Sequence, residues 1–102
     1  MSDTAKTEPE TIRLILHFES RTQPHRSTAV KLERTIRRIE SARESTVRPA
    51  TLSDAPETLI LVLDLVCAPP TYTIDTLVAV LAVIRAELGD AVSAITPVEN
   101  GD

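Results

Sequence analysis

The sequence predicts an α+β domain in which two helices cover one face of a four-stranded antiparallel sheet. Residues 58–68 (TLILVLDLVCA) form the longest apolar run of the chain, without Gly or Pro, which is typical of a buried central strand. Residues 11–19 alternate between apolar and mixed side chains, as a half-buried strand does. Two stretches with apolar residues at helical spacing, 27–45 and 73–88, separate the strands.

The two remaining strands are shorter and contain proline. Residues 46–52 include Pro49, and residues 91–99 include Pro97. Because proline cannot donate to a strand ladder, both segments fit the edges of a sheet. The turn cluster at 53–57 would join the second and third strands as a hairpin.

Right-handed crossovers arrange these elements as a ferredoxin-like βαββαβ sandwich with strand order 4-1-3-2. This topology places the two most apolar strands in the centre and the two proline-containing strands at the edges. If residues 46–52 form a loop instead, a three-stranded sandwich of the thioredoxin-like kind is the alternative. We expect a single domain at 11–99, between a disordered polar tail (1–10) and a C-terminal tail (100–102).

Composition argues against several classes of function. The 102 residues include one Phe, one Tyr and no Trp, so we expect no aromatic platform for bases or sugars. Cys67 is the single cysteine, which excludes an intrachain disulfide and a multi-cysteine zinc site. Residues 1–11 lack the apolar segment of a signal peptide, and the run 58–68 is too short to cross a bilayer as a helix. We therefore expect a cytoplasmic protein that binds no metal, cofactor or membrane.

The net charge of −4 is unevenly distributed along the chain. Residues 1–10 carry −2, residues 11–50 carry nine basic and four acidic side chains, and residues 51–102 carry one basic and eight acidic side chains. The middle segment is therefore +5 and the last segment −7. Such opposite charges can attract each other within one domain or between two copies.

The helix expected at 73–88 is apolar nearly all round. Its expected core stripe consists of Ile74, Leu77, Leu81, Ile84 and Leu88. Much of the opposite side is also apolar and is formed by Ala79, Ala82, Val83 and Ala86. A helix with two apolar sides is usually covered on both, so this second side is a candidate contact with another copy or with a partner protein. The alternative is that alanine is a good helix former and harmless on a surface.

The sheet face without helices is a second candidate interface. Alternation places four apolar residues and three polar ones on it: Ile15, Ile60, Val62 and Val66 with Arg13, His17 and Asp64. A register that pairs Ile15 with Val62 would set Arg13 opposite Asp64, so that the two charges neutralise each other. The alternative is an acid–base pair of His17 and Asp64 in a cleft, but no nucleophile or oxyanion donor accompanies them.

The segment 20–27 is the best candidate for a ligand site. It leads from a strand into a helix N-terminus, whose free amides and dipole favour anions. The side chains that could contact phosphate or carboxylate are Arg21, His25, Arg26, Ser27, Lys31, Arg34 and Arg38. No glycine lets the backbone wrap around a phosphate, so the phosphate-loop and dinucleotide fingerprints are absent. An ordinary basic loop in which Ser27 caps the helix is the alternative.

These features favour a small non-enzymatic interaction or regulatory module that acts as a homo-oligomer or docks on a partner protein. The alternative is an anion- or nucleic-acid-contacting module that uses the basic residues from Arg21 to Arg38, although the acidic balance of the chain disfavours nucleic acid. An enzyme is not favoured. Cys67 continues the core row of its strand, and neither histidine has a matching acidic cluster.

Overall fold

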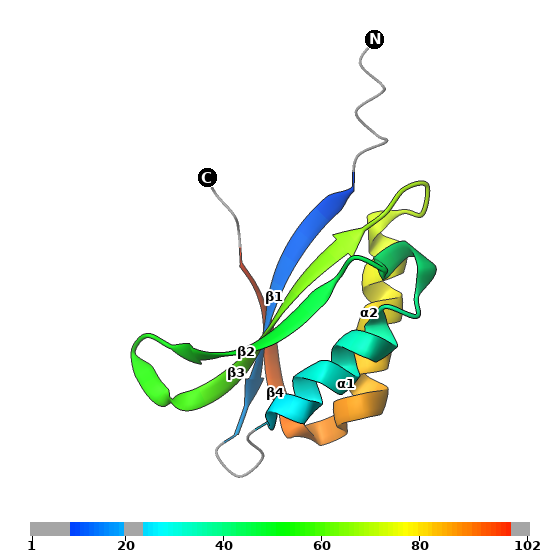
Figure 1. The fold of residues 1–102 in the computed structure, drawn as a ribbon. Coiled ribbons are helices and arrows are strands. Elements are labelled where there is room, and N and C mark those ends of the chain that lie inside the picture. The colour runs from blue at the N-terminus through cyan, green and yellow to red at the C-terminus, as the bar shows by residue number, and fades with distance from the viewer. Residues whose placement is uncertain (1–8, 20–23, 99–102) are drawn as a thin grey trace.

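The computed structural model describes residues 9–19 and 24–98. In order, the elements are β1 (Glu10–Phe18), α1 (Arg26–Ile36), η3 (Glu40–Ala42), β2 (Thr46–Leu52), β3 (Ala55–Cys67), α2 (Thr73–Leu88), η4 (Gly89–Ala91) and β4 (Val92–Val98). The strands form one antiparallel sheet in the order β2-β3-β1-β4, which is 4-1-3-2 read from the other edge (Figure 1). The predicted ferredoxin-like arrangement is therefore confirmed. The thioredoxin-like alternative is wrong, because β2 pairs with β3 along its length.

The predicted tails fall largely outside the described residues. Of the segment 1–10, the structure describes only Pro9 and Glu10, and Glu10 already belongs to β1. The segment 100–102 lies outside the described residues altogether.

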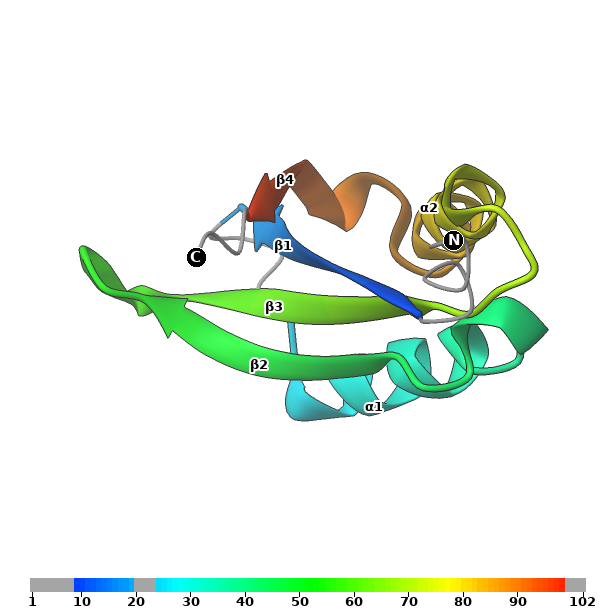
Figure 2. The ribbon, with the colours of Figure 1, turned by 90° about the horizontal axis from the view of Figure 1, so that it is seen from above.

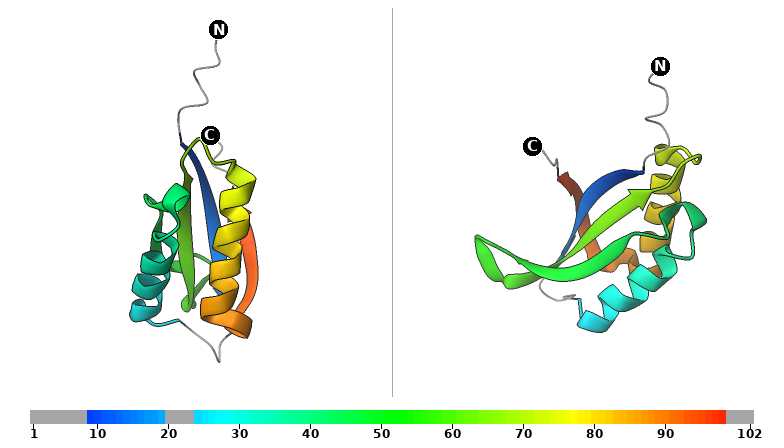
Figure 3. Two further views of the ribbon diagram at one scale, coloured as in Figure 1. Left: turned by 90° about the vertical axis from the view of Figure 1, so that its right-hand side faces the viewer. Right: turned by 45° about the horizontal axis from the view of Figure 1, so that its top comes forward.

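Both helices cover the same face of the sheet and run side by side in opposite directions (Figures 2 and 3). The β2–β3 hairpin extends beyond the helical layer, as the right-hand view of Figure 3 shows. The opposite face carries no helix from the described part of the chain. The molecule is thus a two-layer sandwich with one covered and one open sheet face.

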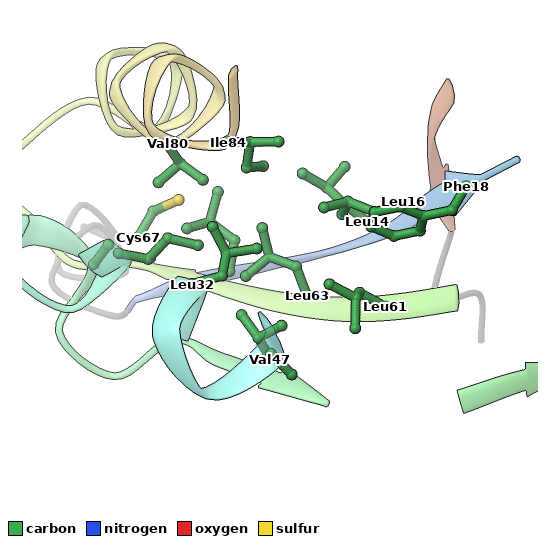
Figure 4. Packing of buried hydrophobic residues seen from close by; sticks show 14 residues of the cluster. Leu14, Leu16, Phe18, Leu32, Val47, Leu61, Leu63, Cys67, Val80 and Ile84 are labelled. Atoms are coloured by element: carbon green, nitrogen blue, oxygen red, sulfur yellow. The ribbon is translucent and has the colours of Figure 1, made fainter. Parts of the chain in front are cut away.

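The core is aliphatic and lies between the sheet and the helices (Figure 4). Alternation along the two central strands directs one row of each toward the helices, so Leu16, Leu61, Leu63 and Leu65 are fully buried. Cys67 ends the β3 row at 3% exposure, as its position in the predicted core row required. The sparse aromatic content shows in this cluster: apart from Phe18, it consists of leucine, isoleucine, valine, alanine and cysteine side chains.

The end of α1 differs from the prediction. The helix ends at Ile36 instead of near Ser45, and Ile39 already has an extended backbone, with ψ of 119°. Tertiary contacts explain the early end: Ala42 and Ser45 are completely buried, and the Ser45 Oγ accepts the Val66 amide at 3.0 Å. A continued helix would carry these residues away from β3.

The start of α1 also differs from the prediction. The helix begins at Arg26 and is capped by His25, whose backbone N–H donates to the Thr28 Oγ1 at 3.2 Å. Ser27 is therefore not the N-cap. Instead, the hydroxyl of Thr28, at the third helical position, closes the first turn by accepting the backbone N–H of His25.

The bounds of α2 match the prediction, but its orientation does not. The helix spans Thr73–Leu88 and stops at Gly89, whose φ of +55° favours glycine. The buried face consists of Thr76, Val80 and Ile84, whereas Ile74 is 67% exposed. Placing Ile74 and Leu81 in the core stripe was therefore wrong. A helix that is apolar all round has no strong preference for one face, and Thr76 decides the matter by pairing its Oγ1 with the Ser41 Oγ at 2.7 Å.

Candidate interaction surface

Four of the five exposed large apolar side chains among the described residues lie on α2 or just before it, and the fifth is Val30 of α1. Ile74 and Val78 are 67% and 61% exposed, Leu81 is 36% exposed, and Tyr72, which precedes the helix, is 75% exposed. At 100° per residue, Val78 lies opposite the buried face formed by Thr76, Val80 and Ile84, and Ile74 and Leu81 lie between Val78 and that face. We call this surface the α2 outer face and define it by Ile74, Asp75, Val78, Leu81, Ala82 and Arg85, all of them exposed.

The α2 outer face exists because the helix uses its other side for the core. Val80 and Ile84 point from α2 toward the sheet and pack with the central leucines (Figure 4). The exposed residues Ile74, Val78 and Leu81 follow at intervals of four and three, so they form one continuous row. The result is a stripe of large aliphatic side chains in a position that charged residues usually occupy.

The α2 residues predicted to form an interface fall on two different sides. Ala82 and Ala86 are exposed and Ala79 is half-buried, whereas Val83 packs against the core cluster. Val83 therefore lies at the edge of the core and is less available to a partner than Ala82 and Ala86 are. The larger residues of the outer face were missed because their helical spacing also suits a core stripe. The one sequence feature that could have indicated this outer face is that the charged residues Asp75 and Arg85 lie on the same side of the helix as Val78.

The open sheet face is less available than expected. Ile60 and Val62 are only 3% and 6% exposed although no helix covers them, and Ile15 and Val66 are half-buried. Val62 lies between Ile15 of β1 and Arg48 of β2, so neighbouring side chains on the twisted sheet cover it. The structure places all four predicted residues on one face, but this face offers less free apolar surface than α2 does.

The predicted register between the central strands is correct for Ile15–Val62 and for Arg13–Asp64. The Arg13 Nε lies 2.6 Å from the Asp64 Oδ1, and a second guanidinium nitrogen lies 3.3 Å from Oδ2. The hydrogen bond to Asp64, together with its charge, raises the pKa of Arg13 above its ordinary value. The pair neutralises Asp64 across the strands, and because it is partly exposed, its main effect is to hold the two side chains in place.

His17 does not join Asp64. Its Nε2 lies 3.0 Å from the Thr96 Oγ1, and His17 pairs with Ala94 of β4. Asp64 is engaged with Arg13, and the β1–β3 ladder ends at Leu16–Leu61, before His17. This geometry gives no support to an acid–base pair.

The predicted anion residues are exposed where the structure describes them. This holds for His25, Arg26, Ser27, Lys31, Arg34 and Arg38, whereas Arg21 lies outside the described residues. A shallow groove of about 130 Å³ lies between the two helices and is lined by Thr28, Lys31, Leu32, Glu87 and Leu88. Lys31 is the one candidate cation among these lining residues, and Glu87 lies across from it. The groove therefore does not gather the cations around a ligand-sized space.

Cys67 has the properties of a core residue. Its side chain is 3% exposed, and burial raises the pKa of the thiol above the ordinary value of 9.0, with a further contribution from the charge of Glu10. The thiol therefore stays protonated at neutral pH and is a weak nucleophile.

The described residues, 9–19 and 24–98, hold neither a cluster of metal ligands nor a helix that could span a membrane. In these ranges no three His, Cys, Asp or Glu side chains lie close enough to hold a metal ion. Neither helix of the described segments has the length and apolar content that crossing a bilayer requires. Comparison with known proteins adds no relative: no protein-family model, curated protein or solved structure matches this chain.

Proposed function

We propose that the protein is a small non-enzymatic interaction or regulatory module that works by self-association or by docking on a partner protein. The observation that carries this proposal is the row of exposed aliphatic residues on α2, Ile74, Val78 and Leu81. Contiguous apolar surface of this kind marks interaction sites on otherwise polar molecules. A cytoplasmic setting suits the single, reduced Cys67.

The neighbouring surfaces support the choice of α2. On the open sheet face, Ile60 and Val62 are already covered within the monomer and would gain little from a partner. The outer side of α1 is dominated by cations, so it offers charge instead of apolar area. The α2 outer face therefore has the most free energy to gain from the exclusion of water.

A photo-crosslinking side chain at Val78 tests the proposal in cells that express the protein. Val30 is the matched control, because it is also an exposed helical valine, with 56% exposure against 61% for Val78. We expect covalent adducts from position 78 and few from position 30, resolved by mass on a denaturing gel. If position 78 forms no more adducts than position 30, the α2 outer face is not an interaction surface.

A second candidate function is supported by the outer side of α1. Its exposed basic residues Arg26, Lys31 and Arg34 project over one broad arc of the helix, and the exposed Arg37 and Arg38 follow directly after its end at Ile36. A cationic arc of this kind can contact the phosphates of a polyanion without any base-reading groups, and such binding weakens steeply with salt.

The double variant Arg26→Ala/Arg34→Ala tests this second function by titration with a short single-stranded DNA. We expect the parent chain to bind at low salt and the variant to bind more weakly. The slope of log K against log salt should fall by about 1.4, or roughly 0.7 for each lost phosphate contact. The control is Arg43→Ala/Arg48→Ala, which removes the same charge outside α1 and should leave the slope nearly unchanged. A parent chain that does not bind DNA even at low salt eliminates this function.

A further inference from the structure

We infer that the occupant of the α2 outer face is a second copy of the same chain, with the two α2 helices packed antiparallel about a two-fold axis. This inference rests on the proposed function and specifies the partner. It follows from the spacing of the exposed residues, from the positions of two charges, and from the character of the other exposed surfaces.

The spacing of the α2 outer face suits another helix. Ile74, Val78, Leu81 and Arg85 follow at intervals of four, three and four, which is the seam that a packed helix pair uses. The helix has 16 residues and is therefore about 24 Å long, so the seam covers most of its length. Ala82 flanks Val78 with a small side chain, which lets a second backbone approach closely.

The charges on this face are self-complementary in only one orientation. Asp75 lies in the first turn of α2 and Arg85 in the last turn, and both are exposed. With a two-fold axis midway between Val78 and Leu81, each Val78 meets the partner's Leu81. The stem of each Arg85 then lies over the Ile74 of the second copy, so its guanidinium can reach the adjacent Asp75.

A parallel pair is disfavoured by the same residues. It would place Asp75 against Asp75 and Arg85 against Arg85, which are like charges at close range. The helix dipoles also favour the antiparallel pair, because each positive N-terminus then lies beside a negative C-terminus. The apolar row and the two charges of the α2 outer face are therefore complementary to the same face of a second copy, so no different protein is needed to pair with them.

The other exposed surfaces do not offer a second copy the same match. Two α1 helices would bring Arg26, Lys31 and Arg34 against like charges. A single helix pair is a small interface, at or below about 1,200 Å². We therefore expect a reversible dimer with a dissociation constant in roughly the micromolar range.

Sedimentation of the full chain across about 1 μM to 1 mM tests the inference with five variants, one of them a control. The parent chain should shift from monomer to dimer in this range. Asp75→Arg and Arg85→Asp should each weaken dimerisation by about tenfold or more, since each brings like charges together. The double variant Asp75→Arg/Arg85→Asp should return the dissociation constant to within about threefold of the parent value, because it exchanges the charges and keeps the pairs. Val78→Glu should abolish the dimer, whereas Val30→Glu, its control on α1, should leave it intact.

Circular dichroism of each variant checks that it is folded, so that loss of the dimer can be told apart from unfolding. A parent chain that stays monomeric throughout overturns the inference. A double variant as weak as the single variants overturns the antiparallel pairing. Crosslinking separates this result from failure of the proposed function. If the parent chain is monomeric and position 78 forms adducts with a different protein, the inferred homodimer is wrong but the proposed interaction surface stands. If position 78 forms no adducts at all, both the homodimer and the proposed function are wrong.

Discussion

Leu63→Ala is expected to lower the free energy of unfolding by about 2–5 kcal/mol, because it opens a cavity at the centre of the core. Leu63 is completely buried on the middle of β3, where it pairs with Leu14 of β1 and Val47 of β2. Its neighbours are held by two flanking strands and by the helices above them, so they have little freedom to move in and fill the space. The expected loss is a large part of the roughly 5–15 kcal/mol that a small domain has.

Urea unfolding followed by circular dichroism measures this change. The control is Val30→Ala, which removes methyl groups from an exposed helical site and should alter the unfolding free energy by no more than about 0.5 kcal/mol. Should Leu63→Ala not fold, Leu63→Val removes a single methylene equivalent and is expected to cost about 1 kcal/mol. Equal, small effects at positions 63 and 30 would contradict the placement of the core.

Ser45→Ala is expected to cost about 1–3 kcal/mol, although it removes only one oxygen. Ser45 is fully buried, and its Oγ accepts the backbone N–H of Val66 at 3.0 Å. The paired part of β2 starts at Thr46, opposite Asp64. The Val66 amide therefore lies beyond the end of the β2–β3 ladder, and the Ser45 hydroxyl is its acceptor in place of a β2 carbonyl. Without the hydroxyl, the partly buried Val66 amide would lose its acceptor, which is more costly than the loss of an exposed hydrogen bond.

Amide hydrogen exchange gives a local measurement of the same prediction. In Ser45→Ala, the Val66 amide should exchange faster than in the parent chain by a larger factor than the amides of the β1–β3 ladder. Ser53→Ala is the control, because Ser53 lies exposed in the hairpin turn and should change neither the stability nor the exchange at Val66. Unchanged exchange of the Val66 amide in Ser45→Ala would show that the Ser45 hydroxyl does not hold β3.

The candidate site was only partly predictable from the sequence. The alternation on the two central strands placed Arg13 and Asp64 on one face, and the assumed pairing of Ile15 with Val62, which the structure has, set the two charges opposite each other. The apolar surplus of α2 predicted a helix with an exposed apolar side. It did not predict that Ile74 and Leu81, instead of Val83, would lie on that side. With apolar residues all round, several rotations of the helix bury similar areas, so periodicity cannot choose between them.

The sequence by itself determined the topology. Strand alternation, the edge prolines Pro49 and Pro97, and the stop at Gly89 act through neighbouring residues, and they agree with one strand order. Contacts between distant segments decided how α2 is rotated against the sheet and where α1 ends. The Ser41–Thr76 hydrogen bond sets the rotation of α2, and the buried Ser45 ends α1 early. These pairs lie 35 and 21 residues apart along the chain, so no local pattern reports them, and only the folded structure brings their hydroxyls and amides within hydrogen-bonding distance.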